Sequence, residues 1–94
     1  MAKRVSDEER LSRYYDSDGR LTSFPSKRRL KDLVLDRLAG RFQSEKEYSE
    51  PEINEIIRQS HTFGDHALLR RELIDARILK RQKDGSTYWK PATQ

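Results

Sequence analysis

The sequence predicts one small α+β domain, in which helices come first and a β-hairpin closes the chain. Three observations predict it. Apolar residues recur at three- and four-residue intervals between residues 26 and 77, which is typical of amphipathic helices. Strong N-capping signals precede these stretches. Near the end, Asp84-Gly85 separates two strand-like segments. A chain of 94 residues has the length of one domain with a single core.

The chain is expected to begin with an N-terminal arm, residues 1–25. Within it, residues 6–15 are predicted to form a short helix, with Ser6 as N-cap and Glu9 completing a capping box. Pro25 forces extended geometry on the residue before it and separates the arm from the first core helix.

The first core helix is predicted over residues 27–41, with Ser26 as its N-cap. Its apolar face consists of Leu30, Leu33, Val34, Leu38 and, at its end, Phe42.

The second core helix has the strongest local signature. Ser49 to Glu52 combines a capping box, an early proline and acidic residues at the positive end of the helix dipole. This helix should end near Ser60, and Tyr48 before it is expected in a short strand. Asp65 then caps a third helix over 66–77, and His61 lies in the linker between the two helices.

Residues 78–90 are predicted to form the hairpin. Asp84 and Gly85 tolerate positive φ, so they favour a two-residue turn. The order of helix, short helix, helix and hairpin is that of a winged helix-turn-helix, with three core helices, a C-terminal wing and the N-terminal arm. The winged-helix domain is expected over 26–91, with a frayed tail at 92–94. The alternative is a small α+β domain of the same elements packed differently.

Composition excludes several classes of function. The chain has no cysteine, so no disulfide or thiolate metal site exists, and its start lacks the apolar stretch of a signal peptide. We expect a cytoplasmic protein without a membrane span or cofactor. Phosphate-binding loops and nucleophile motifs are absent, so we predict no enzymatic activity. His61, Asp65 and His66 lack a further strong ligand, and we predict no metal site.

Charge distribution favours nucleic acid, with DNA preferred. Residues 26–43 and 77–90 each carry a net charge of +4, and residues 44–60 between them carry −3. Such zones attract phosphates if the fold brings residues 27–41 and 80–90 to one side. The candidate contacts are Lys27, Arg28, Arg29 and Lys31 in the first core helix, Arg70, Arg71 and Arg77 in the third, and Lys80, Arg81 and Lys83 in the wing.

Other interpretations remain open. Asp65, Glu72 and Asp75 offset the three arginines of the third helix, and a four-residue spacing allows an Arg71–Asp75 ion pair. The acidic second helix also favours a protein-protein interaction domain on a winged-helix scaffold. The chain is expected to be a monomer or a weak homodimer, the latter through Tyr14 and Tyr15.

Four ordered motifs resemble a bacterial family of unknown function. They are Asp18-Gly-Arg-Leu-Thr-Ser-Phe-Pro-Ser-Lys-Arg-Arg29, Tyr48-Ser-Glu-Pro-Glu-Ile-Asn-Glu-Ile57, Asp65-His-Ala-Leu-Leu-Arg-Arg-Glu-Leu-Ile-Asp75 and Asp84-Gly-Ser-Thr-Tyr-Trp89. Domains of that family occur alone or fused behind helix-turn-helix regulators. The resemblance implies a regulator-associated domain and no established activity.

Overall fold

A computed structural model describes residues 6–92. Its helices are α1 (Asp7–Ser12), α2 (Arg28–Ala39), α3 (Glu50–Arg58) and α4 (His66–Asp75), and its strands are β1 (Glu47–Ser49), β2 (Lys80–Arg81) and β3 (Thr87–Trp89). The predicted α+β class is confirmed. Residues 1–5 of the arm and 93–94 of the expected frayed tail lie outside the described residues.

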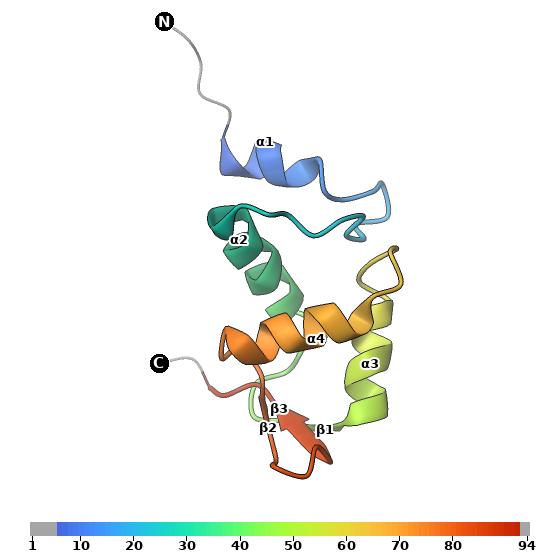
Figure 1. The fold of residues 1–94 in the computed structure, drawn as a ribbon, viewed down its shortest axis with the longest axis vertical. Helices are drawn as coiled ribbons and strands as arrows, with labels where there is room; N and C mark the ends of the chain where they lie inside the picture. The colour runs from blue at the N-terminus through green and yellow to red at the C-terminus, as the bar shows by residue number, and fades with distance from the viewer. Residues whose placement is uncertain (1–5, 93–94) are drawn as a thin grey trace, which may run out of the picture.

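The three strands form one antiparallel sheet in the order β1-β3-β2. Tyr48 of β1 lies opposite Tyr88 of β3, and Arg81 of β2 lies opposite Tyr88 on its other side. Figure 1 shows α1 at one end of the molecule, the hairpin at the other, and α4 crossing between them. The short strand expected at Tyr48 is therefore confirmed, and it joins the hairpin.

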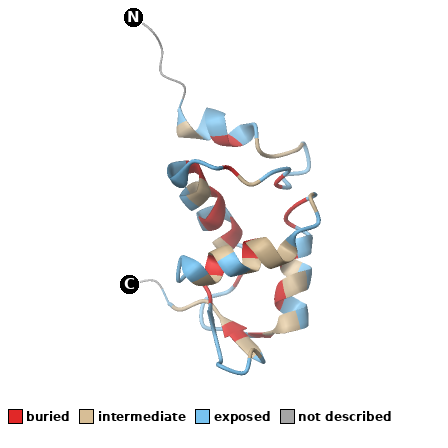
Figure 2. Ribbon diagram, viewed as in Figure 1, coloured by how far each residue is buried: buried red, intermediate tan, exposed pale blue. Residues whose placement is uncertain are grey.

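The core lies where α2, α3, α4 and the sheet face one another, and Figure 2 colours its buried positions red. Ile53 and Ile57 of α3 and Leu69 and Leu73 of α4 have 0% exposed surface. Each pair is four residues apart, so one stripe of each helix is buried against the other. The regular spacing of apolar residues thus leads directly to the packing of α3 on α4.

The N-terminal arm contributes to the same core. Leu11 and Leu21 are only 1% and 3% exposed. The N–H of Leu21 donates to the carbonyl of Ser60 at 2.8 Å, and the N–H of Thr62 donates to the carbonyl of Leu21 at 2.9 Å. These bonds fasten the arm to the segment between α3 and α4. The helix expected at residues 6–15 is shorter in the structure, where α1 ends at Ser12.

Most of the predicted caps are present. Ser6 accepts from the N–H of Glu9, Ser49 and Glu52 form the complete capping box, and Asp65 accepts from the N–H of Leu68. The cap assigned to Ser26 is wrong, because α2 begins one residue later and its N-cap is Lys27. The ammonium of lysine accepts no hydrogen bond, so this helix starts without a side-chain cap.

The predicted two-residue turn is also wrong, although the hairpin forms. Gln82 donates to the carbonyl of Thr87 at 2.9 Å, which leaves four residues, 83–86, in the loop. Gly85 has a φ of 74°, whereas Asp84 is not in the positive-φ region. The Asp84 carboxylate instead accepts from the N–H and the hydroxyl of Ser86 at 3.0 and 2.7 Å. This local side-chain turn favours the wider loop.

The capping box makes the stability of the fold depend on pH. The N–H of Ser49 donates to the Glu52 carboxylate at 2.9 Å and lowers the pKa of that group. A lowered pKa stabilises the fold above the ordinary pKa of glutamate, and that contribution disappears as the pH falls through the folded-state pKa. We expect Glu52→Gln to reduce the difference in unfolding free energy between about pH 7 and about pH 3 in urea denaturation.

The matched control is Glu55→Gln, which removes a carboxylate from the same helix. This carboxylate accepts a hydrogen bond from the side-chain amide of Gln59. The reduction should be smaller than for Glu52→Gln, because Glu55 takes no part in the capping box. An equal reduction in both variants would contradict the assignment to the capping box.

Candidate nucleic-acid interface

A hollow of about 310 Å³ lies between α4 and the hairpin. Its lining includes Arg70, Arg71 and Asp75 of α4 together with Arg81 and Tyr88 of the hairpin. Arg81 faces this side because it pairs with the buried Tyr88, and cross-strand partners share a face of the sheet. The fold therefore brings three of the predicted contacts, from α4 and β2, to one place.

Arg70 is part of the connection between α4 and α3. Its side chain is 24% exposed, and its guanidinium lies 3.3 Å from a carboxylate oxygen of Glu50. The same nitrogen donates to the amide oxygen of Asn54. Both partners belong to α3, so the charge of Arg70 is already neutralised and its position is set by helix packing. Arg70 is a positioning residue and contributes little free positive charge.

Arg71 and Arg81 are both exposed. Among residues 6–92, neither has a carboxylate within 4.0 Å, and the Arg71–Asp75 ion pair that the four-residue spacing allows is not formed. Asp75 nevertheless lines the same hollow, where its negative charge offsets part of theirs. The hollow is thus weakly positive, and its two available guanidinium groups come from different elements.

Arg77 lies just beyond the end of α4 in a conformation that favours glycine. Its φ is 62°, its N–H donates to the carbonyl of Ile74 at 2.9 Å, and the N–H of Ile78 donates to the carbonyl of Leu73 at 3.0 Å. This pair of bonds is a Schellman C-cap, whose left-handed residue is usually glycine. An exposed arginine in that position costs roughly 1–2 kcal/mol in backbone strain.

We expect Arg77→Gly to raise the free energy of unfolding by about 1 kcal/mol, because glycine adopts positive φ without a steric cost. Arg77→Ala is the control, since it removes the same charge and keeps the strained Cβ. Chemical denaturation of both variants checks the prediction. A gain in the alanine variant equal to that in the glycine variant would mean that the charge, and not the backbone, is responsible.

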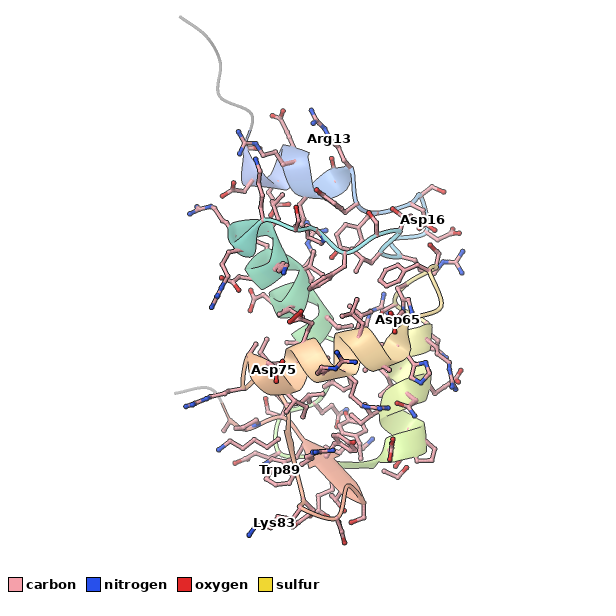
Figure 3. The ribbon with its side chains drawn as sticks, viewed as in Figure 1. Arg13, Asp16, Asp65, Asp75, Lys83 and Trp89 are labelled. Carbon is pink, nitrogen blue, oxygen red and sulfur yellow. The ribbon has the colours of Figure 1, made fainter. Side chains whose placement is uncertain are left out.

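Lys80 and Lys83 are the other two predicted contacts in the hairpin. Lys80 pairs with Trp89 and therefore points to the opposite face from Arg81, as the alternation of a strand requires. Lys83 lies in the loop, at the far tip of the hairpin in Figure 3. Both are exposed, so the hairpin presents positive charge on its two faces and at its tip.

The cations at the start of α2 lie elsewhere. Arg29 pairs with Asp7 of α1, Arg28 lies 3.8 Å from Asp32, and the ammonium of Lys31 lies 5.7 Å from the centre of the Phe24 ring. These cations and the exposed Lys27 lie at the end of α2 that is next to α1.

The hypothesis that residues 27–41 and 80–90 form one positive side is wrong for this end of α2. A helix of 12 residues is about 18 Å long, and it is the far end that reaches the hairpin, where the Lys90 ammonium donates to the carbonyl of Ala39 at 3.0 Å. Figure 3 places Arg13, just after α1, and Lys83 at opposite ends of the molecule.

The sequence interpretation missed the burial of His61. This linker residue is only 5% exposed. Its Nδ1 lies 2.7 Å from the carbonyl oxygen of Ile57, and its ring lies 4.6 Å from that of Phe63. Ser60 and Thr62 flank it with no apolar periodicity, so no local signal reveals that the arm covers this position.

The nearby His66 is half-buried at the start of α4. Desolvation lowers its pKa, and the charges of Arg58 and Arg70 lower it further. Its neighbour Asp65 is engaged as the N-cap of α4. Over the described part of the chain, no three histidine, aspartate or glutamate side chains come together in a way that would hold a metal ion.

Comparison with known proteins gives a family and no individual relative. Residues 20–90 match DUF2087, a family described as "Uncharacterized protein conserved in bacteria". No curated protein and no solved structure matches the chain. Within residues 6–92, none of the helices has the length and hydrophobicity needed to cross a lipid bilayer. Because the match covers most of the chain and includes α2, α3, α4 and the hairpin, this protein belongs to the DUF2087 family of bacterial proteins.

Proposed function

We propose that this chain is a winged-helix domain that binds DNA in bacterial transcription regulation, without catalytic activity. The observation that carries the proposal is the pair of exposed guanidinium groups, Arg71 and Arg81, on the two sides of the hollow between α4 and the hairpin. In a winged helix, the second helix of the helix-turn-helix enters the major groove while other elements contact the backbone.

The order of elements supports the winged-helix assignment. A helix, a strand, two helices and a hairpin follow one another as α2, β1, α3, α4 and β2–β3, and the last strand lies between the other two. The segment between α3 and α4, residues 59–65, is longer than the three- or four-residue turn of the simplest helix-turn-helix, but it contains Gly64 with a φ of 71°.

The charges of the surface indicate the mode of binding. Arg71 is in position to approach base edges or phosphates, and Arg77, Lys80, Arg81 and Lys83 are exposed cations suited to phosphates. Asp75 and the acidic residues of α3 weaken the field near α4. We therefore expect an interaction dominated by phosphate contacts, with modest sequence preference.

Fluorescence anisotropy with a labelled duplex tests the proposal. Five phosphate contacts predict that the affinity falls about five hundredfold between about 50 and about 200 mM monovalent salt, because each contact releases about 0.9 counterion. Titration at several salt concentrations gives the slope directly. Absence of binding at the lowest salt concentration would overturn the proposal.

A second candidate is a protein-protein interaction domain on the same scaffold. Glu52 and Glu55 are exposed on α3, which packs beside α4, and this acidic surface disfavours a close approach to DNA. A purified complex with a protein partner that persists after nuclease treatment, together with no duplex binding, would favour this candidate.

A further inference from the structure

A second hollow, of about 320 Å³, lies between the N-terminal arm and α2, and its lining residues include none from the hairpin. Its apolar wall includes Leu21 from the arm and Val34 and Leu38 from α2. Its polar lining includes Tyr15, Arg37 and Arg41, and Arg41 comes just after α2 in the chain. Its volume is at the lower end of the range for small-molecule sites, about 300–1,000 Å³.

The charged residues that line this hollow are positive. Among its lining residues there are two arginines and no aspartate or glutamate. The guanidinium of Arg37 forms an ion pair with the carboxylate of the exposed Glu8, at a nitrogen–oxygen distance of 2.7 Å. Its central carbon lies 5.0 Å from the centre of the Tyr15 ring. For Arg41, no carboxylate of residues 6–92 lies within ion-pair distance.

The hydroxyl of Tyr15 lies in the field of both arginines. Burial raises the pKa of Tyr15, and the charges of Arg37 and Arg41 oppose that increase. The neighbouring carboxylate of Asp16 is engaged by the guanidinium of Arg20 at 3.5 Å and by the N–H of Arg20 at 2.8 Å. The protonated hydroxyl of Tyr15 and the guanidinium of Arg41 line the same hollow, so they offer two kinds of donor to one anion.

We propose that this hollow binds a small apolar carboxylate, with the hydrocarbon part against Leu21, Val34 and Leu38 and the carboxylate on Arg41 and the Tyr15 hydroxyl. An apolar wall with a few polar groups at one side is typical of small-molecule sites. The planar fork of arginine matches a carboxylate in geometry and charge. The site uses the arm and α2, so it is independent of whether α4 and the hairpin bind DNA.

The probes are benzoate and octanoate, each compared with its uncharged amide, benzamide and octanamide. Isothermal titration measures affinity, and methyl NMR of the wild-type protein identifies the contacts. We expect both acids to bind at least about tenfold more tightly than their amides, because a charge-assisted hydrogen bond is worth about that factor or more. The methyl signals of Leu21, Val34 and Leu38 should shift on addition of acid.

Arg41→Met keeps the length of the side chain and removes its charge, and it should weaken binding of both acids at least about tenfold. Arg58→Met on the exposed surface of α3 is the matched control and should leave the affinity unchanged. If Arg41→Met does not fold, the wild-type NMR shifts and the comparison of acids with amides decide the question. No shift of the three methyl signals, equal affinity for acid and amide, or equal loss in both variants would overturn the proposal.

Discussion

Replacement of Leu73 by alanine is expected to lower the free energy of unfolding by about 2–5 kcal/mol. Leu73 has 0% exposed surface and lies in α4 where this helix packs on α3. Alanine would leave a cavity that the neighbouring side chains of a close-packed core fill only in part. Domains of this size have a total stability of about 5–15 kcal/mol, so the loss is large enough to measure by urea denaturation.

The adjacent Ile74→Ala is the matched control. Ile74 is partly buried and lines the hollow between α4 and the hairpin, so its truncation should cost less than that of Leu73. The change in helix propensity differs between Leu73→Ala and Ile74→Ala by only a few tenths of a kcal/mol. A larger loss at Ile74 than at Leu73 would contradict the face of α4 that the structure assigns to the core.

Removal of the three exposed cations of the hairpin by Lys80→Gln, Arg81→Gln and Lys83→Gln is expected to reduce duplex affinity at least about a hundredfold at about 50 mM salt. The slope of log affinity against log salt should become less steep by about three, since about one unit is lost per phosphate contact. All three side chains are exposed, so the free energy of unfolding should change little.

The control carries the same change in net charge at the other end of the molecule. Lys27→Gln, Arg28→Gln and Arg29→Gln remove three cations from the end of α2 that contacts α1. If DNA binds at α4 and the hairpin, this variant should keep most of the affinity. Equal losses in the two triple variants would indicate that overall charge, and not the hairpin surface, governs binding.

Much of the architecture is predictable because its signals are local. The capping box of Ser49 and Glu52 and the cap at Asp65 are hydrogen bonds between residues three apart. The buried stripes of α3 and α4 arise from a periodicity within one turn of helix. Prediction from local signals fails where two local arrangements are possible. At the start of α2, Ser26 and Lys27 are alternative N-caps, and in the hairpin loop the side-chain turn of Asp84 replaces a two-residue turn.

The candidate site is less predictable, because the availability of a charge depends on residues distant in the chain. The ion pair between Arg29 and Asp7 spans 22 residues, and Arg70 bonds Asn54 across 16. Both pairs exist only because one helix packs beside another. Charge counting along the chain treats Arg70 and Arg71 alike, whereas packing ties Arg70 to α3 and leaves Arg71 exposed.

Local patterns in the chain were therefore sufficient for the α+β class, the three core helices and the presence of the hairpin, since each depends on interactions within a few residues. Tertiary packing settled the distance between the start of α2 and the hairpin, the burial of His61 beneath the arm and the hollow beside Arg41. These features depend on the contact of Leu21 with Ser60 and on the packing of α1 against α2. The free energy of such packing comes from apolar surface that segments distant in the chain remove from water together.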